Sequence, residues 1–175
     1  MAGWMGTGKS TIARAAATAT GAIVLDHDTT KTALLEAGVT HPPAGAASYR
    51  VVHAIAADLL SQGHSVIIDS PALYESIPEI GAAIAAQANA RYLFVECQCP
   101  DEIADRRIES RTNRTSQAAT AAEARSIRED PNRTPARPAG AVILDTTLAE
   151  AESVGTLLGW LRSDQLDSST SPDRL

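Results

Sequence analysis

The chain has 175 residues, 44% of them hydrophobic, and a formal net charge of −6, which fits one acidic domain rather than two. The acidic balance argues against a protein that coats long nucleic acid, because such proteins carry a basic surplus. Cys97 and Cys99 are too few for a disulfide framework, and we expect both thiols to be buried and reduced. No apolar run approaches a membrane span and no signal-peptide pattern opens the chain, so a cytoplasmic α/β domain is expected.

The first half of the chain alternates between helical and strand patterns. An Ala-rich helix is predicted over 9–20, followed by a strand over 22–26. A longer helix is predicted over 46–62, with Gly63 in the position of a terminating glycine, and a second strand over 65–69. Both strands are short, nearly continuous apolar runs, which is typical of parallel strands covered on both faces.

The second half continues the alternation. Isoleucines at helical spacing mark a helix over 77–84, and a third strand is predicted over 92–97. Pro100 stands where the first residue of a helix would be, and that helix is expected to run to about Arg111, with a break over 113–117.

A capping box of threonine and glutamate opens a further helix over 120–129, and three prolines make 130–140 a loop. The last strand is predicted over 141–145. Thr147 and Glu150 have capping-box spacing for the last helix, which ends near residue 162.

This alternation predicts a parallel sheet of four strands with flanking helices. We expect one domain over 1–162 and a polar tail over 163–175 that is disordered.

One motif carries specific chemistry. Residues 3–10 read GWMGTGKS and fit G-x-x-x-x-G-K-[ST] at every defined position. Glycines let successive backbone N–H groups point at phosphate oxygens, and the helix that follows directs its positive end at the same oxygens. Lys9 is therefore expected to bind the β- and γ-phosphates, and the Ser10 hydroxyl to bind Mg²⁺. The expected nucleotide-binding residues are Gly3, Gly6, Thr7, Gly8, Lys9, Ser10 and Thr11.

With this loop the sequence resembles the P-loop small-molecule kinases, in particular the group of AAA-type ATPase-like or zeta-toxin-like kinases. Polynucleotide kinase and chloramphenicol phosphotransferase are relatives of that group. The resemblance covers about residues 3–162 and includes AIVLDHD, VIID, the segment P-x6-RIESR from Pro100 and VILDTT, in the expected order. It implies a nucleoside-kinase-like P-loop fold, ATP-dependent phosphoryl transfer and a mobile lid over about 104–138 that carries arginines.

Acidic residues follow two of the predicted strands. Asp69 resembles a Walker B acid and is expected to hold Mg²⁺ directly or through water, the alternative being a capping or turn aspartate. The resemblance implies that Asp28 accepts the proton of the acceptor hydroxyl or orients that hydroxyl, and that Lys31 helps to hold the acceptor. The alternative for Asp28 is the N-cap of a helix over 29–37. His27 is expected to be a structural or surface histidine.

Two arginines of the lid segment share one helix face, because Arg107 and Arg111 are four residues apart. We expect this face to close over the phosphates and stabilise the charge that develops on the γ-phosphoryl group. The alternative is a solvated helix pair in which these arginines form salt bridges with the acidic residues of the same segment.

The start of the chain departs from the pattern of the group. A buried strand of about 5–6 residues normally leads into such a loop, whereas here Met1 and Ala2 alone precede Gly3. We therefore expect the first strand to be missing and its two neighbours to lack a ladder of hydrogen bonds. One hypothesis is that Met1 is an internal methionine of a longer reading frame. The alternative is a chain that lacks the strand and is unstable or dependent on a partner.

The combined interpretation is an enzyme that binds ATP and Mg²⁺ and transfers the γ-phosphoryl group to a hydroxyl of a small-molecule or nucleotide acceptor. Its expected catalytic residues are Lys9, Asp28, Arg107 and Arg111. One alternative is a nucleotide-binding module without catalysis, and another is a zeta-toxin-like kinase of a sugar nucleotide.

Overall fold

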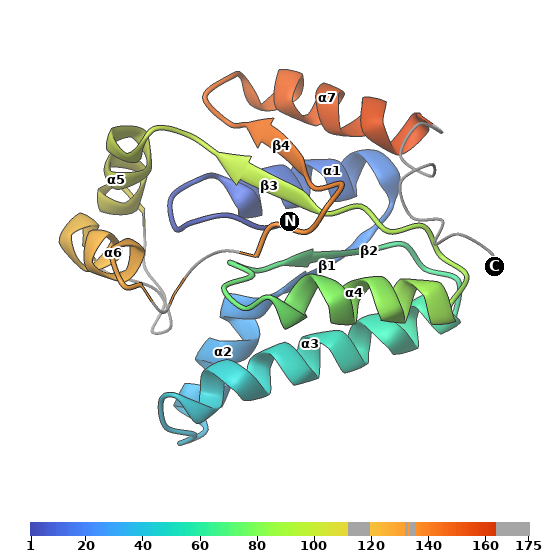
Figure 1. Cartoon of the computed structure of the whole chain (residues 1–175), viewed down its shortest axis with the longest axis horizontal. Coiled ribbons are helices and arrows are strands. Elements are labelled where there is room, and N and C mark those ends of the chain that lie inside the picture. The colour runs from blue at the N-terminus through green and yellow to red at the C-terminus, as the bar shows by residue number, and fades with distance from the viewer. Residues whose placement is uncertain (112–119, 132, 134–135, 164–175) are drawn as a thin grey trace.

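The computed structural model describes residues 1–111, 120–131, 133 and 136–163. The strands are β1 (Ile23–Asp26), β2 (Val66–Asp69), β3 (Val95–Gln98) and β4 (Val142–Asp145). The helices are α1 (Lys9–Thr20), α2 (His27–Glu36), α3 (Pro43–Ser61), α4 (Ser76–Gln87), α5 (Asp101–Glu109), α6 (Ala121–Arg128) and α7 (Glu150–Arg162). The predicted α/β class, with parallel strands and flanking helices, is confirmed (Figure 1).

The four strands form two small sheets rather than one. β1 pairs with β2 and β3 pairs with β4, parallel in both cases. The expectation of a single four-stranded sheet is therefore wrong for the described residues. The reason is that the position between β2 and β3 is occupied only at its end, by the first two residues of the chain.

Met1 and Ala2 connect the two sheets. On one side the Met1 ammonium donates to the carbonyl of Ile68 at 2.8 Å, and the Ser70 N–H donates to the carbonyl of Met1 at 3.2 Å. On the other side the Ala2 N–H donates to the carbonyl of Val95 at 2.7 Å, and the Cys97 N–H donates to that of Ala2 at 2.8 Å. The two residues thus form the last step of a parallel strand between β2 and β3.

Beside Met1, a cavity of about 670 Å³ lies between β2 and β3. Its lining is largely apolar and comes from both sheets and from the helices that cover them, including Ile67, Ile68, Ile77, Ile84, Phe94, Val95, Leu157 and Leu161. Burial lowers the pKa of the Met1 amino group, because a charged ammonium loses its hydration there.

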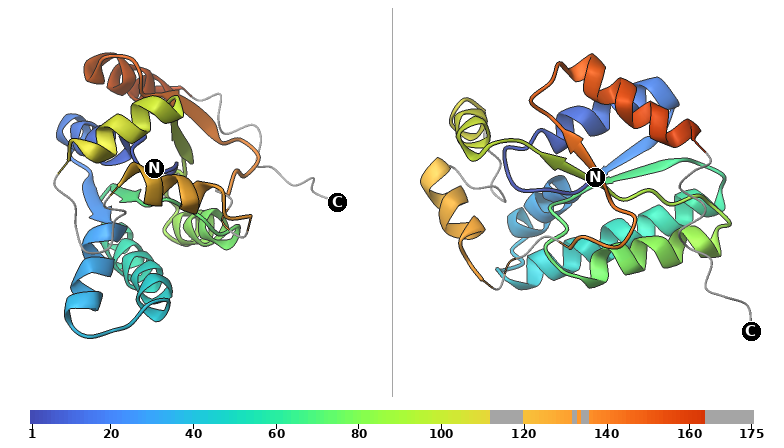
Figure 2. Two further views of the ribbon diagram at one scale, coloured as in Figure 1. Left: turned by 90° about the vertical axis from the view of Figure 1, so that its left-hand side faces the viewer. Right: turned by 45° about the horizontal axis from the view of Figure 1, so that its top comes forward.

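Helices cover the sheets on both faces. α1 and α7 lie together on one side of the strands and α3 and α4 on the other, while α5 and α6 form a separate pair near the carboxyl ends of the strands (Figures 1 and 2). The main core lies under α1 and α7 and is aliphatic, as the small aromatic content predicts; its members are Ile12, Ala16, Val95, Cys97, Leu144, Val154 and Leu157. This packing directs the carboxyl ends of all four strands to one edge.

The two cysteines differ in environment. Cys97 is fully buried in this core, where burial raises the pKa of its thiol to about 11, and both cysteines are free. Cys99 is only half-buried, because it follows the end of β3. The expectation of a buried thiol is confirmed for Cys97 and wrong for Cys99.

Helix ends test the capping predictions. Gly63 takes the left-handed conformation at φ 85°, as predicted for a terminating glycine, and Gly21 at the end of α1 does so at φ 74°. The predicted capping box at Thr120 is present in both directions. The one predicted at Thr147 is wrong, because Thr147 donates its N–H and hydroxyl to Asp145 Oδ1, at 2.8 and 2.7 Å, and α7 begins three residues later.

Pro100 precedes α5 as its N-cap rather than lying inside it, and α5 ends at Glu109, two residues earlier than predicted. The predicted break over 113–117 and the tail from residue 164 lie outside the described residues.

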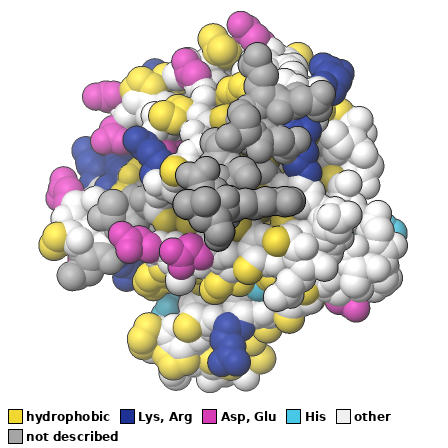
Figure 3. Space-filling view, turned by 45° about the vertical axis from the view of Figure 1, so that its right-hand side comes forward, with side chains coloured by type: hydrophobic (Ala, Val, Ile, Leu, Met, Phe, Trp, Pro, Cys, Tyr) yellow, Lys and Arg dark blue, Asp and Glu magenta, His cyan; other side chains and the backbone are white. Residues whose placement is uncertain are grey.

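On the face drawn in Figure 3, hydrophobic side chains lie among acidic and basic ones. None of the helices that the structure describes has the length and apolar character needed to cross a membrane.

Candidate active site

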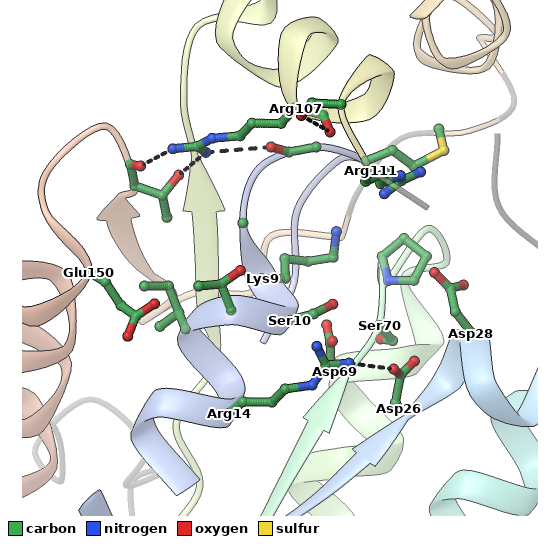
Figure 4. Close-up of a pocket in the computed structure, with 18 of the residues that line it drawn as sticks. Lys9, Ser10, Arg14, Asp26, Asp28, Asp69, Ser70, Arg107, Arg111 and Glu150 are labelled. Carbon is green, nitrogen blue, oxygen red and sulfur yellow. Dashed lines mark hydrogen bonds and ion pairs between the residues drawn. The ribbon is translucent and has the colours of Figure 1, made fainter. Parts of the chain in front are cut away.

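A cavity of about 490 Å³ opens at the carboxyl ends of the strands, between the glycine-rich loop, β1, β2 and α5 (Figure 4). Ligand pockets commonly have this size, and open α/β sheets bind ligands at this edge. The cavity brings together predicted site residues from distant parts of the chain, namely Gly6, Gly8, Lys9, Ser10, Thr11, Asp28, Asp69, Arg107 and Arg111. Gly3, Thr7 and Lys31, which were also predicted, do not line it.

The glycine-rich loop needs its glycines for two reasons. Gly3, Gly6 and Gly8 have φ angles of +126°, +83° and +81°, which L side chains rarely adopt. A Cβ on Gly6 would also lie 2.4 Å from the carbonyl oxygen of Ala104, and one on Gly3 would lie 2.4 Å from that of Cys97. The loop is therefore packed directly against α5 and the end of β3.

Lys9 begins α1 and lies across this loop. Its Nζ donates to the carbonyl of Trp4 at 2.8 Å, and the Thr7 hydroxyl donates to the same oxygen at 2.8 Å. The first turn of α1 contains no acidic residue, so no carboxylate there neutralises the partial positive charge of the helix N-terminus. The start of α1 thus presents an ammonium and backbone N–H groups to the cavity, which suits a polyphosphate.

Ser10 and Asp69 line the same part of the cavity (Figure 4). Asp69 ends β2 and is buried, with 4% of its surface exposed. Carboxylate and hydroxyl oxygens are the donors that Mg²⁺ takes from proteins, and it needs only one or two of them beside substrate phosphates. The donor set therefore fits Mg²⁺. The described residues hold no cluster of three His, Cys, Asp or Glu side chains, so phosphate oxygens would have to complete the coordination.

The start of α2 corrects one alternative. The N-cap of α2 is Asp26, whose Oδ1 accepts the Thr29 N–H at 3.1 Å and whose other oxygen lies 3.5 Å from Arg14. Asp28 is instead in the first turn of the helix, and its side chain, 32% exposed, lies on the cavity wall. The N-cap interpretation of Asp28 is therefore wrong.

Lys31 lies one turn further along α2 and is half-buried. Burial lowers the pKa of its ammonium, the Asp28 carboxylate opposes this shift, and Arg133 adds to it. The structure therefore places Lys31 close enough to Asp28 to interact with it, although it does not place Lys31 on the cavity wall.

Arg107 holds three parts of the site together. Its Nη2 donates to the carbonyl of Thr146 at 2.7 Å, and its Nη1 to the Thr146 hydroxyl at 3.4 Å and to the carbonyl of Gly6 at 3.5 Å (Figure 4). This arginine thus links α5 to the glycine-rich loop and to the segment after β4. Arg111 lines the cavity two residues beyond the end of α5.

Two arginines of α6 form salt bridges of the kind that the alternative describes. Arg128 of α6 is buried, with 8% of its side chain exposed, and its Nη2 lies 2.6 Å from Asp105 of α5. Arg125 lies 3.6 Å from the same carboxylate. Carboxylates of α5 therefore hold α6 in place, whereas Arg107 faces the loop.

Thr146 is a site residue that sequence reasoning did not single out. It is 4% exposed, and its hydroxyl lies 2.7 Å from the carbonyl of Thr7 and 3.0 Å from that of Gln98. The available signal was a polar residue directly after the apolar run VILD, at the carboxyl end of a strand. Asp26, Ser70 and Glu150 also line the cavity; Asp26 ends β1, Ser70 follows β2 and Glu150 begins α7.

Comparison with known proteins identifies the family of the chain. A family model described as an AAA domain matches residues 1–130. The chain belongs to this AAA domain family. A search of curated proteins found no match.

Solved kinase structures share the fold of this AAA domain protein. The APS kinase of Mycobacterium tuberculosis, solved with AMPPNP and APS, is 21% identical, with a TM-score of 0.70 and coverage of 93% of this chain and 95% of that one. A gluconokinase from Sinorhizobium meliloti 1021 is 19% identical, with a TM-score of 0.64 and coverage of 96% and 94%. The shikimate kinase of Acinetobacter baumannii, solved with shikimate, is 18% identical, with a TM-score of 0.53 and coverage of 97% and 93%. These likenesses confirm the fold that the sequence resemblance implied.

Proposed function

We propose that the protein is an ATP-dependent kinase that transfers the γ-phosphoryl group to a hydroxyl of a small-molecule or nucleotide acceptor. The observation that carries this proposal is one cavity that joins Lys9 and Ser10 of the loop with the carboxylates of Asp69 and Asp28. The similar structures support it, because one is named for APS, one for gluconate and one for shikimate, and all are kinases.

On the donor side, Lys9 exchanges its bond with the Trp4 carbonyl for the β- and γ-phosphate oxygens of ATP. That exchange replaces a neutral acceptor by a charged one, which strengthens the hydrogen bond. Backbone N–H groups of residues 6–11 hold the remaining oxygens. Ser10 and Asp69, together with the phosphates, would hold Mg²⁺, which would supply positive charge to neutralise the charge that develops during transfer.

On the acceptor side, Asp28 orients the acceptor hydroxyl and takes its proton as the new bond to phosphorus forms. Its partial exposure gives the acceptor access, and its position across the cavity from Lys9 separates the donor from the acceptor (Figure 4). Lys31 helps to hold the acceptor on the outer side of Asp28.

The two arginines have different parts in this proposal. Arg107 keeps the glycine-rich loop, α5 and the segment after β4 in register through Thr146. Arg111 contacts the transferring phosphoryl group and stabilises its developing charge. Of the two arginines predicted for the lid, Arg107 thus anchors α5 to the loop and Arg111 contacts the phosphoryl group.

A test compares three variants in a coupled assay of ADP release against a panel of sugars, nucleosides and sugar nucleotides. Asp28→Asn is expected to lose transfer by about 100-fold or more while still binding Mg-ATP, because general-base catalysis contributes about 10²–10⁴. Lys9→Met should lose both phosphoryl transfer and Mg-ATP binding. Asp58→Asn, an exposed aspartate of α3, is the matched control and should behave as wild type. Binding of Mg-ATP without ADP release in the presence of any acceptor would instead identify a nucleotide-binding module.

A further inference from the structure

The residue beside the proposed base is a buried histidine whose second ring nitrogen has no hydrogen-bond partner. His27 is the first residue of α2, and its side chain is 5% exposed. Its ring packs against that of Tyr49 of α3, with 4.1 Å between ring centroids. Its Nδ1 is buried without a hydrogen bond and lies 3.5 Å from Asp28 Oδ1.

The hydrogen bonds of Ser48 determine which nitrogen carries the hydrogen. The Ser48 hydroxyl lies 2.7 Å from the carbonyl of Gly45 and 2.8 Å from His27 Nε2. A carbonyl only accepts, so the single hydroxyl hydrogen of Ser48 goes to Gly45. Ser48 Oγ must therefore accept the hydrogen of Nε2. A neutral His27 then carries its lone pair on Nδ1, 3.5 Å from Asp28 Oδ1.

Two proton-accepting atoms thus lie next to each other, and water does not reach one of them. A carboxylate oxygen and a lone pair at this separation repel unless a proton lies between them. Asp28 is the residue that receives a proton in the proposed reaction. A proton between the two atoms would remove this repulsion, and the proposed reaction delivers a proton to Asp28.

We propose that His27 Nδ1 receives the proton that Asp28 takes from the acceptor, so that the pair acts as a relay; this rests on the proposed function. The acceptor oxygen forms a bond to the γ-phosphorus, and the bond from that phosphorus to the bridging oxygen breaks, leaving its electron pair on ADP. The hydroxyl proton passes to Asp28 and then to Nδ1. After the product leaves, it returns through the partly exposed Asp28 to water. His27 acts through Asp28 and is a positioning residue.

Other charged and titratable groups surround the pair. On α2 these are Asp28 itself and Lys31, on α3 Tyr49 and His53, after β2 Tyr74, and after α6 Arg133. Burial and the neighbouring His27 lower the pKa of His53, and burial raises that of Tyr49. His53 therefore provides a matched control, because it is a second buried histidine near Tyr49 and does not line the active-site cavity.

The first measurement is independent of turnover. Nitrogen-15 NMR of the imidazole rings, assigned with His27→Gln, is expected to show the Nε2–H tautomer of His27. The Nδ1 signal is also expected to change in Asp28→Asn, because that substitution removes the carboxylate that lies 3.5 Å from Nδ1. An Nδ1–H tautomer, or an Nδ1 signal that Asp28→Asn leaves unchanged, would overturn the relay.

The second measurement is the pH profile of ADP release, with the best acceptor of the panel or with water as acceptor. His27→Gln is expected to lower kcat by about 10-fold or more, to leave KM for ATP unchanged and to alter the acidic limb, whereas His53→Gln retains the wild-type limb. An unchanged limb in His27→Gln, including a uniform loss at every pH, overturns the relay and leaves the kinase proposal intact. Absence of Mg-ATP binding by wild type overturns the kinase proposal, and the relay with it, whatever the NMR shows.

Discussion

The pair of Glu96 and Arg137 connects the segment after α6 to the centre of the fold, and its removal should be measurable. Glu96 lies on β3 and is 5% exposed. Arg137 donates to both of its carboxylate oxygens, at 2.6 and 2.8 Å, and Gln98 donates to one of them at 2.8 Å. Arg137→Ala leaves a buried carboxylate that keeps the hydrogen bond from the Gln98 amide.

The expected loss follows from these contacts. A hydrogen bond to a charged group contributes about 1.5–3 kcal/mol, and two are lost here. The Arg137 side chain is 54% exposed, so water replaces part of the interaction, and we expect a net loss of about 2 kcal/mol. For a chain of this length that corresponds to a decrease in Tm of roughly 4–8 °C.

Differential scanning calorimetry of Arg137→Ala and Arg125→Ala tests this value. Arg125 is a matched control, because its side chain is 58% exposed and also approaches a carboxylate, but at 3.6 Å from Asp105. Such a surface pair contributes about 0.2–1 kcal/mol, so its Tm should change by less than about 3 °C. Equal, small changes in the two variants would refute the reasoning, since exposure alone would then decide the loss.

The pH dependence gives a second check. The hydrogen bonds from Arg137 hold the pKa of Glu96 below its ordinary value of 4.5. A carboxylate with a lowered pKa stabilises the fold above that ordinary value and loses this contribution as the pH falls through its folded value. The difference in unfolding free energy between wild type and Arg137→Ala should therefore be constant near pH 7 and decrease below about pH 4.

Three further perturbations follow from the packing. Ile108→Ala should lower the unfolding free energy by about 3 kcal/mol in urea titrations, because Ile108 is fully buried against α6; a loss below 1 kcal/mol would contradict the packing. Gly6→Ala should abolish the Mg-ATP-induced change in Tm, because its Cβ would lie 2.4 Å from the Ala104 carbonyl; a retained change would contradict the loop geometry. Five apolar residues with high strand propensity fused before Met1 should raise Tm by several degrees over a Gly/Ser fusion of equal length, because they fit the apolar cavity between β2 and β3 and remove a buried ammonium. Equal Tm values would show that the cavity does not take a strand.

Local patterns predicted much of the fold and the site. The P-loop motif, the apolar strands and the aspartates that end three of them are short contiguous signals, and the chemistry of each follows from consecutive residues. Because parallel strands end at one edge of a sheet, the sequence could also indicate that Lys9, Asp28 and Asp69 share a cavity. Their arrangement in the structure agrees with that expectation.

Contacts between distant residues were not predictable in this way. Nothing near Arg107 in the sequence indicates that its guanidinium bonds to Thr146, thirty-nine positions away. The sequence did indicate a missing strand between β2 and β3, but not the hydrogen bonds by which Met1 and Ala2 bridge these two strands. Such contacts arise from tertiary packing, which local propensity does not encode.

Competition between nearby polar groups explains the errors at helix starts. DHD offers two aspartates as N-caps of α2, and Asp26 takes that role because its side chain reaches the Thr29 N–H. At α7 the expected cap, Thr147, bonds instead to Asp145, two residues before it. Short polar side chains often make such local bonds, so spacing alone does not decide which one caps a helix.

The most direct test of the central claim is the Tm of the chain with and without Mg-ATP, measured for wild type, Lys9→Met and Lys31→Met. These are the two lysines of the sequence, and only Lys9 lines the cavity. Ligand at about 100 times its Kd adds about 2.7 kcal/mol of stability, or roughly 5–10 °C here. We predict that change for wild type and Lys31→Met and its loss in Lys9→Met. Equal changes in all three proteins, or none in wild type, would contradict a nucleotide site built on the P-loop.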